Sequence, residues 1–220
     1  MSLHMPNQDA VRYDTRGSAS VIVLADGVSS CAKAQEGARI TVNAVAETLL
    51  ADSNFFLNCA EDFVRHLIME RVRYALAKQA EADHEDIKEY ASTLSFVLCD
   101  DESHRLLSFA LGDGLSVWTD GKQCQALALP KRHHDAYGSV TATTTENAAM
   151  ATCVCFADTK EMKSIALFTD GAWKRMNEGG LLGREYAELI RNSSYLSLGE
   201  HLSKNKECRD DSSFISLCFA

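Results

Sequence analysis

Two apolar segments that each end on Asp-Gly constrain this chain most. Val21 to Ala25 is an uninterrupted apolar run, rich in β-branched residues, that leads into Asp26-Gly27. Such a run predicts a strand that is covered on both faces. The same arrangement returns where residues 164–169 lead into Asp170-Gly171. Because each aspartate follows a buried strand, we expect the two to form two halves of one site.

The first half of the chain predicts one strand pair followed by two helices. Residues 7–13 read as a short strand, and a turn at 14–17 connects it to the strand at 20–25. Apolar residues recur at helical spacing over 35–50 and over about 60–81. Both stretches are therefore expected to be helices that pack on the strands.

From residue 93 onward, short strand-like runs predominate. The runs at 93–99, 105–110, 115–119 and 122–127 predict an antiparallel meander. Residues 130–147, rich in His and Thr, predict a long surface excursion. Further strands are expected at 152–156, 164–169 and 214–219, and helices at 185–191 and 196–204. This order predicts an α+β class with sheets between helices, in a single domain over 1–220 because no linker is visible.

Composition excludes several functional classes. The net charge of −9 argues against nucleic acid as a partner. No apolar run approaches the roughly 20 residues of a membrane span, and no signal-peptide pattern is visible, so we expect a cytoplasmic protein without membrane partners. The 8 cysteines form no C-x-x-C pair, which is typical of buried thiols in a reducing compartment. Met1-Ser2-Leu3 matches a vector remnant, which would place the native start further upstream.

Aspartates recur at or near the ends of predicted strands. They are Asp9, Asp26, Asp113, Asp170 and the pair Asp210-Asp211. Carboxylates gathered at one sheet edge repel one another unless cations lie between them, and oxygen ligands favour Mg²⁺ or Mn²⁺. Two such ions about 4 Å apart can share a water and direct it at a phosphoryl group. Any single Asp-Gly is also a common turn signal, and we assign Asp120-Gly121 to a hairpin turn.

These motifs resemble those of the metal-dependent PP2C (PPM) family of serine/threonine protein phosphatases, in particular its compact bacterial members. Each motif alone is weak, whereas six in order at plausible spacing indicate the fold. The matching segments are Asn7-Gln8-Asp9-Ala10, Leu24-Ala25-Asp26-Gly27-Val28, Ser92-Thr93-Leu94, Leu111-Gly112-Asp113-Gly114, Phe168-Thr169-Asp170-Gly171 and Asp210-Asp211-Ser212-Ser213.

The resemblance implies a PP2C-like four-layer α-β-β-α sandwich with two central antiparallel sheets and two Mn²⁺ or Mg²⁺ ions at one end. It implies that Asp26 bridges both ions and that the Gly27 carbonyl joins one of them. Asp170 and Asp210 would complete the other ligand set, and Asp9 would bind through water or orient the nucleophile. A metal-bridging hydroxide would then hydrolyse phosphoserine or phosphothreonine in a phosphoprotein without a phosphoenzyme. The implied context is a monomer with a bacterial kinase partner.

Three departures from the family pattern modify this expectation. Where many members carry a phosphate-binding arginine, this chain has His4, which would contact the substrate phosphate as in compact bacterial members. The family's Gly-Asp-Ser is Gly112-Asp113-Gly114, which keeps the Asp113 carboxylate for a third ion. The acidic residue often found four positions after the metal aspartate is Lys174. We therefore expect a weak or absent third site beside an intact two-metal core.

Other candidate groups have plainer explanations. Cys59 and Arg65 have the C-x5-R spacing of cysteine-dependent phosphatases, but the residues between them lack the glycines and serines that cradle phosphate. Cys153 and Cys155 would share one strand face without a further ligand nearby in sequence. His133-His134 favours a solvated loop. Trp118 and Trp173 favour core or rim packing.

Two alternatives to an active protein phosphatase stay open. Lys174 and the missing arginine would also suit a catalytically weak or inactive PP2C-like binding or regulatory module. A metal phosphohydrolase acting on a small phosphoester would use the same carboxylates.

Overall fold

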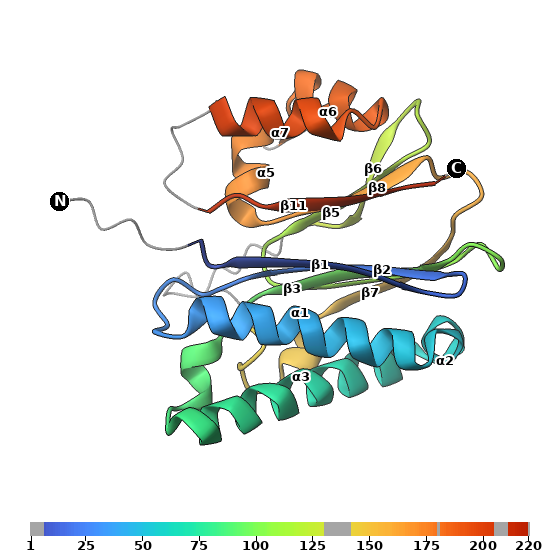
Figure 1. Cartoon of the computed structure of the whole chain (residues 1–220). Coiled ribbons are helices and arrows are strands. Elements are labelled where there is room, and N and C mark those ends of the chain that lie inside the picture. The colour runs from blue at the N-terminus through green and yellow to red at the C-terminus, as the bar shows by residue number, and fades with distance from the viewer. Residues whose placement is uncertain (1–6, 130–141, 180, 205–210, 220) are drawn as a thin grey trace.

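Two antiparallel sheets pack face to face between layers of helices, as the resemblance implies (Figure 1). The computed structural model describes residues 7–129, 142–179, 181–204 and 211–219. The first sheet has the order β1-β2-β3-β4-β7, with bounds Asp9–Arg16, Ala19–Asp26, Leu94–Asp100, Arg105–Leu111 and Cys153–Asp158. The second has the order β11-β8-β5-β6, with bounds Phe214–Cys218, Ser164–Phe168, Leu115–Thr119 and Cys124–Ala128.

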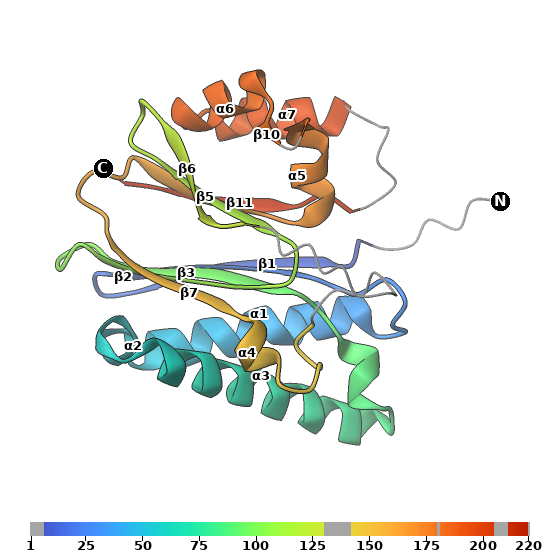
Figure 2. The same ribbon diagram turned by 180° about the vertical axis from the view of Figure 1, so that it is seen from behind.

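Each sheet has its own helical cover, which Figures 1 and 2 show from opposite sides. The first is covered by α1 (Ala34–Ala51) and α3 (Glu61–Asp83), and the second by α5 (Asp170–Met176), α6 (Arg184–Arg191) and α7 (Tyr195–Lys204). The shorter elements are α2 (Ser53–Asn58), η1 (Ile87–Tyr90), α4 (Ala148–Ala151), β9 (Asn177–Glu178) and β10 (Leu181–Leu182). Within the described segments, no helix combines the length and apolarity needed to cross a membrane.

Strand β2 is buried on both faces, as its apolar run predicts. Val21 and Val23 belong to the core beneath α1 and α3, whereas Ile22 and Leu24 belong to the layer between the two sheets. All four are at most 3% exposed. Because successive side chains of a strand point to opposite faces, β2 contributes residues to two separate cores. A third core lies between the second sheet and helices α5, α6 and α7.

The predicted meander over residues 93–127 is wrong at its centre. Strands β3 and β4 form a hairpin in the first sheet, but β5 and β6 form a hairpin in the second. The chain crosses between sheets at Gly112, whose φ of 107° suits glycine, and at Gly114. A Cβ on Gly114 would lie 2.9 Å from the Phe168 carbonyl oxygen, so the crossing needs this close backbone approach. Strand periodicity carries no signal for a change of sheet.

Several local predictions also differ from the structure. β1 runs on to Arg16, so the predicted turn at 14–17 shrinks to Gly17 and Ser18, where Gly17 has a φ of 62°. The sequence pattern does not predict helices α2 and α5. Within the expected surface excursion, Ala142 and Thr143 are buried, and Thr143 N donates to Ser92 O at 2.8 Å, whereas residues 145–147 are exposed as predicted.

Candidate functional site

Three of the predicted carboxylates meet at one end of the sandwich. Asp9 begins β1 and Asp26 ends β2, and antiparallel pairing places them directly opposite each other. Asp170 follows β8 of the second sheet and begins α5. The side chain of Asp26 is within hydrogen-bonding contact of both Asp9 and Asp170. The structure thus brings together the ends of the two strands that the sequence singles out.

The three carboxylates are crowded in a poorly solvated place. Burial, followed by the charges of Asp9 and Asp170, raises the pKa of Asp26 to about 10. Burial also raises the pKa of Asp9, although hydrogen bonds from Ser213 and Thr169 oppose that rise. Like charges in low dielectric disfavour one another's ionised form. A cation between these groups would relieve the repulsion.

Two oxygen atoms of this cluster have no partner among the described residues. They are Asp9 Oδ1 and Asp170 Oδ1, both buried. A buried acceptor without a partner costs about 1–3 kcal/mol, and a hard divalent cation is the ligand that carboxylate oxygens prefer. The chemistry of the donor set therefore fits Mg²⁺ or Mn²⁺. In the described ranges, no group of three or more His, Cys, Asp or Glu is yet arranged to hold an ion.

Backbone contacts fix the predicted Asp26-Gly27 pair. Thr93 Oγ1 accepts from Asp26 N at 3.0 Å, and Thr93 N donates to Asp26 O at 2.8 Å. Gly27 N donates to Gln8 O at 3.2 Å. A Cβ on Gly27 would lie 2.7 Å from the Ala34 carbonyl oxygen, so only glycine fits between these backbones. The motif around Thr93 thus acts through the backbone of the Asp26 turn.

Hydroxyl groups next to the motif aspartates tie the two sheets together. Thr169 Oγ1 lies 3.3 Å from Asp9 Oδ2 and 3.2 Å from Ser213 O, and it accepts from Ser213 N at 3.0 Å. Asp211 Oδ2 accepts from Gln8 N at 2.7 Å. The sequence pattern predicts no role for Thr169 or Ser213, and it identifies Asp211 only as one of the strand-end aspartates. The only sequence signal for these three residues is their position inside the motifs that contain the expected metal ligands.

Helix α5 contributes a lysine and a tryptophan that both make hydrogen bonds at this end of the sandwich. Lys174 Nζ donates to Asp170 Oδ2 across one helical turn. Trp173 Nε1 donates to the carbonyl oxygen of Asp113 at 2.9 Å. Asp113, expected at a third ion, therefore lies in a segment that α5 holds in place. Trp173 packs as predicted and also makes this hydrogen bond.

Not every predicted site residue can be placed. Asp210 and His4 lie outside the described residues, as does the His133-His134 pair. Asp120 is placed away from the carboxylate cluster. Its Oδ1 accepts from Lys122 N and Gln123 N in the β5–β6 hairpin turn, where Gly121 has a φ of 86°, so the turn assignment is confirmed.

The C-x5-R spacing does not form a phosphate loop. Arg65 bonds to Thr152 and to Glu61, and burial raises the pKa of the Cys59 thiol. A phosphate-binding cysteine would instead need a lowered thiol pKa.

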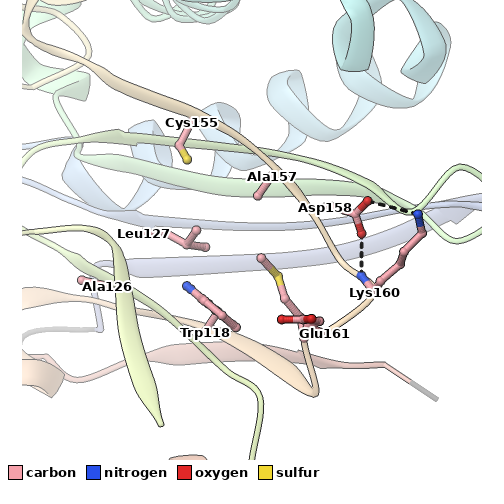
Figure 3. Close-up of a pocket in the computed structure, with 9 residues that line it drawn as sticks. Trp118, Ala126, Leu127, Cys155, Ala157, Asp158, Lys160 and Glu161 are labelled. Carbon is pink, nitrogen blue, oxygen red and sulfur yellow. Dashed lines mark hydrogen bonds and ion pairs between the residues drawn. The ribbon is translucent and has the colours of Figure 1, made fainter.

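Cys155 and Trp118 belong to a different part of the molecule from the carboxylates. They lie on β7 and β5, on either side of a pocket of about 590 Å³ (Figure 3). The carboxylates of Asp9, Asp26 and Asp170 do not line this pocket. Trp118 is partly buried and packs against the layer between the two sheets, which agrees with the predicted core or rim packing.

A polar network behind the cluster holds the segment that follows Asp26. Tyr90 Oη donates to Asp83 Oδ2 at 2.5 Å, and Lys33 Nζ lies 3.4 Å from the same oxygen. Val28 N donates to Ala91 O at 2.9 Å. These contacts connect the end of α3 and η1 to the loop that precedes α1.

We expect Asp83→Asn to lower the melting temperature at pH 7, because the hydrogen bond from Tyr90 and the charge of Lys33 lower the pKa of Asp83. A carboxylate whose pKa is lower in the folded state stabilises the fold above its unfolded pKa and loses that effect as the pH falls. The difference from wild type should therefore shrink between about pH 5 and pH 3. Thermal denaturation across this range checks it. Glu81→Gln, which replaces an exposed carboxylate at the same helix end, is the control and should leave the melting temperature at pH 7 close to that of wild type.

Comparison with known proteins agrees with this geometry. A sequence profile described as Protein phosphatase 2C matches residues 2–213. No curated protein sequence matches this chain significantly.

Among solved structures, the serine/threonine phosphatase Stp1 from Staphylococcus aureus is similar, with a TM-score of 0.75 and 13% identity over 100% of this chain and 92% of that one. RsbX in complex with magnesium has a TM-score of 0.62 and 12% identity over 98% and 88% of the two chains. The SiaA-PP2C domain of Pseudomonas aeruginosa has a TM-score of 0.65 and 15% identity over 97% and 80%.

Proposed function

Because the chain belongs to the protein phosphatase 2C family, we propose that it hydrolyses phosphoserine and phosphothreonine in phosphoproteins with the help of two Mn²⁺ or Mg²⁺ ions. The observation that carries the proposal is the meeting of Asp9, Asp26 and Asp170 from both sheets, with two buried carboxylate oxygens that lack a partner among the described residues. A neighbour of the same fold in complex with magnesium supports the choice of ion. We further propose that residues 1–220 act as one domain and as a monomer, opposite a bacterial kinase.

Each aspartate has a distinct proposed role. Asp26, which contacts both of the other carboxylates, would bridge the two ions, and the Gly27 carbonyl would bind one of them. Asp170 and Asp210 would complete the ligand set, and Asp113 would contribute to any third ion. The bound ions would supply an activated water and neutralise the substrate phosphate.

The chain's own groups would hold these ligands and orient the attacking water. Thr93 fixes the Asp26 turn through two hydrogen bonds to the backbone of Asp26, one from its own backbone N and one at its side-chain Oγ1. Thr169 is close enough to hold Asp9 Oδ2, which leaves Asp9 Oδ1 to accept a hydrogen bond from the attacking water. No side-chain nucleophile is needed. His4 would contact the phosphate.

The test is phosphate release from phosphoserine, phosphothreonine and phosphotyrosine peptides, with Mn²⁺, Mg²⁺ or EDTA. We expect turnover of the first two peptides with either ion and none with EDTA. Robust turnover in EDTA would contradict the proposal. Absence of turnover with every ion would favour a binding or regulatory module, and clearly faster turnover of small phosphometabolites would favour the small-molecule phosphohydrolase.

A further inference from the structure

The ammonium group of Lys174 binds the same carboxylate that the proposed metal centre would use. Lys174 and Asp170 are one helical turn apart on α5, and Nζ donates to Asp170 Oδ2. The other oxygen, Asp170 Oδ1, is buried and has no partner among the described residues. The Asp170 side chain is 13% exposed, whereas that of Lys174 is 49% exposed. The carboxylate of this ion pair is therefore largely buried, whereas its lysine is half-exposed.

This ion pair brings a positive charge to a cluster dominated by carboxylates. Asp26 contacts both Asp9 and Asp170, and the charge of Asp211 acts on Asp9. Arg12, further along β1 from Asp9, is instead engaged by Asp14 and Glu47. The Lys174 ammonium thus partly neutralises a crowded acidic site from the side of the second sheet.

We infer that Lys174 is a resident counter-cation that competes with a divalent ion for Asp170. In the ion-free protein it neutralises Asp170. An entering ion must separate Oδ2 from the ammonium or bind beside that positive charge, and either event weakens its binding. The long aliphatic stem and the exposure of Lys174 let the head group leave toward water without disturbing α5. Lys174 therefore sets the metal affinity of the site. This inference rests on the metal centre of the proposed function.

The test is Mn²⁺ binding measured by isothermal titration calorimetry on wild type, Lys174→Met and Lys174→Arg. Methionine is close to lysine in length and helix propensity but removes its charge. Because a unit charge at ion-pair distance is removed, we expect Lys174→Met to bind Mn²⁺ about tenfold or more tightly than wild type. Lys174→Arg should stay within a few-fold of wild type. Lys160→Met, which removes a lysine paired with Asp158, is the matched control and should leave the affinity unchanged.

Unchanged or weaker Mn²⁺ binding by Lys174→Met would overturn the inference, because a merely structural ion pair predicts one of these results. Circular dichroism of each ion-free variant verifies that the affinities are compared between folded proteins. If wild type binds Mn²⁺ and Lys174→Met binds it more tightly, but no phosphopeptide is hydrolysed, the inference stands and the proposed function fails. If neither protein binds Mn²⁺, both fail.

Discussion

Asp26→Asn should abolish metal-dependent phosphate release while leaving the ion-free fold at least as stable as wild type. Burial and the charges of Asp9 and Asp170 raise the pKa of Asp26 to about 10, so folding at pH 7 without ions requires Asp26 to take up a proton, and the neutral amide of asparagine avoids that cost. The same change removes the oxygen proposed to bridge two ions. Mutations in the mere partners of metal ligands typically reduce affinity or activity by about 10–100-fold, so we expect a loss larger than about 100-fold for this ligand.

Two measurements separate these effects. Melting temperature in EDTA should be equal to or above that of wild type, and the rise in melting temperature on adding Mn²⁺ should disappear. Asp120→Asn is the matched control, because Asp120 also precedes a glycine but holds a hairpin turn. It should keep wild-type turnover. Wild-type turnover by Asp26→Asn, or a large loss of ion-free stability, would contradict the role proposed for Asp26.

The sequence distinguishes Asp26 from Asp120 by the strand in front of each. A long apolar run before Asp26 predicts burial on both faces, and β2 has it. The run before Asp120 is short, and its Asp-Gly pair forms a turn. Register then places Asp9 opposite Asp26 because both strands are antiparallel and their hairpin is short. The local sequence pattern and the hairpin geometry are therefore enough to predict the half of the candidate site that the first sheet contributes, Asp9 and Asp26.

The half of the site that the second sheet contributes depends on how the two sheets stack, and the alternation of apolar residues along a strand does not encode that stacking. The second sheet brings Thr169 to Asp9 and Asp170 to Asp26 across the sandwich. Helix α5 begins at Asp170 and so turns Lys174 back onto it. Residues four apart face each other only in a helix, so the Asp170–Lys174 pair cannot be predicted from a sequence pattern that identifies Asp170-Gly171 only as the end of a strand.

Gly37→Ala should cause a large loss of stability, although it adds a single methyl group. A Cβ on Gly37 would lie 2.1 Å from the Tyr90 carbonyl oxygen and 2.5 Å from its carbon, so α1 and η1 would have to separate. Backbone atoms cannot rotate away as a flexible side chain can. We expect a loss of about 3 kcal/mol or more in the free energy of unfolding, at or beyond the upper end of overpacking effects. Chemical denaturation at pH 7 measures it.

Gly199→Ala is the matched control, since both glycines are helical and only their surroundings differ. The added methyl on α7 would meet the Phe214 ring at 3.7 Å, an ordinary contact, so the higher helix propensity of alanine should stabilise by about 0.5–1 kcal/mol. Separation of α1 from η1 would also strain the Tyr90–Asp83–Lys33 contacts and the Val28–Ala91 hydrogen bond. Because these hold the segment after Asp26, Gly37→Ala should weaken Mn²⁺ binding even where it remains folded, whereas Gly199→Ala should not. Equal stabilities of the two variants would show that α1 and η1 do not pack as closely as their backbones indicate.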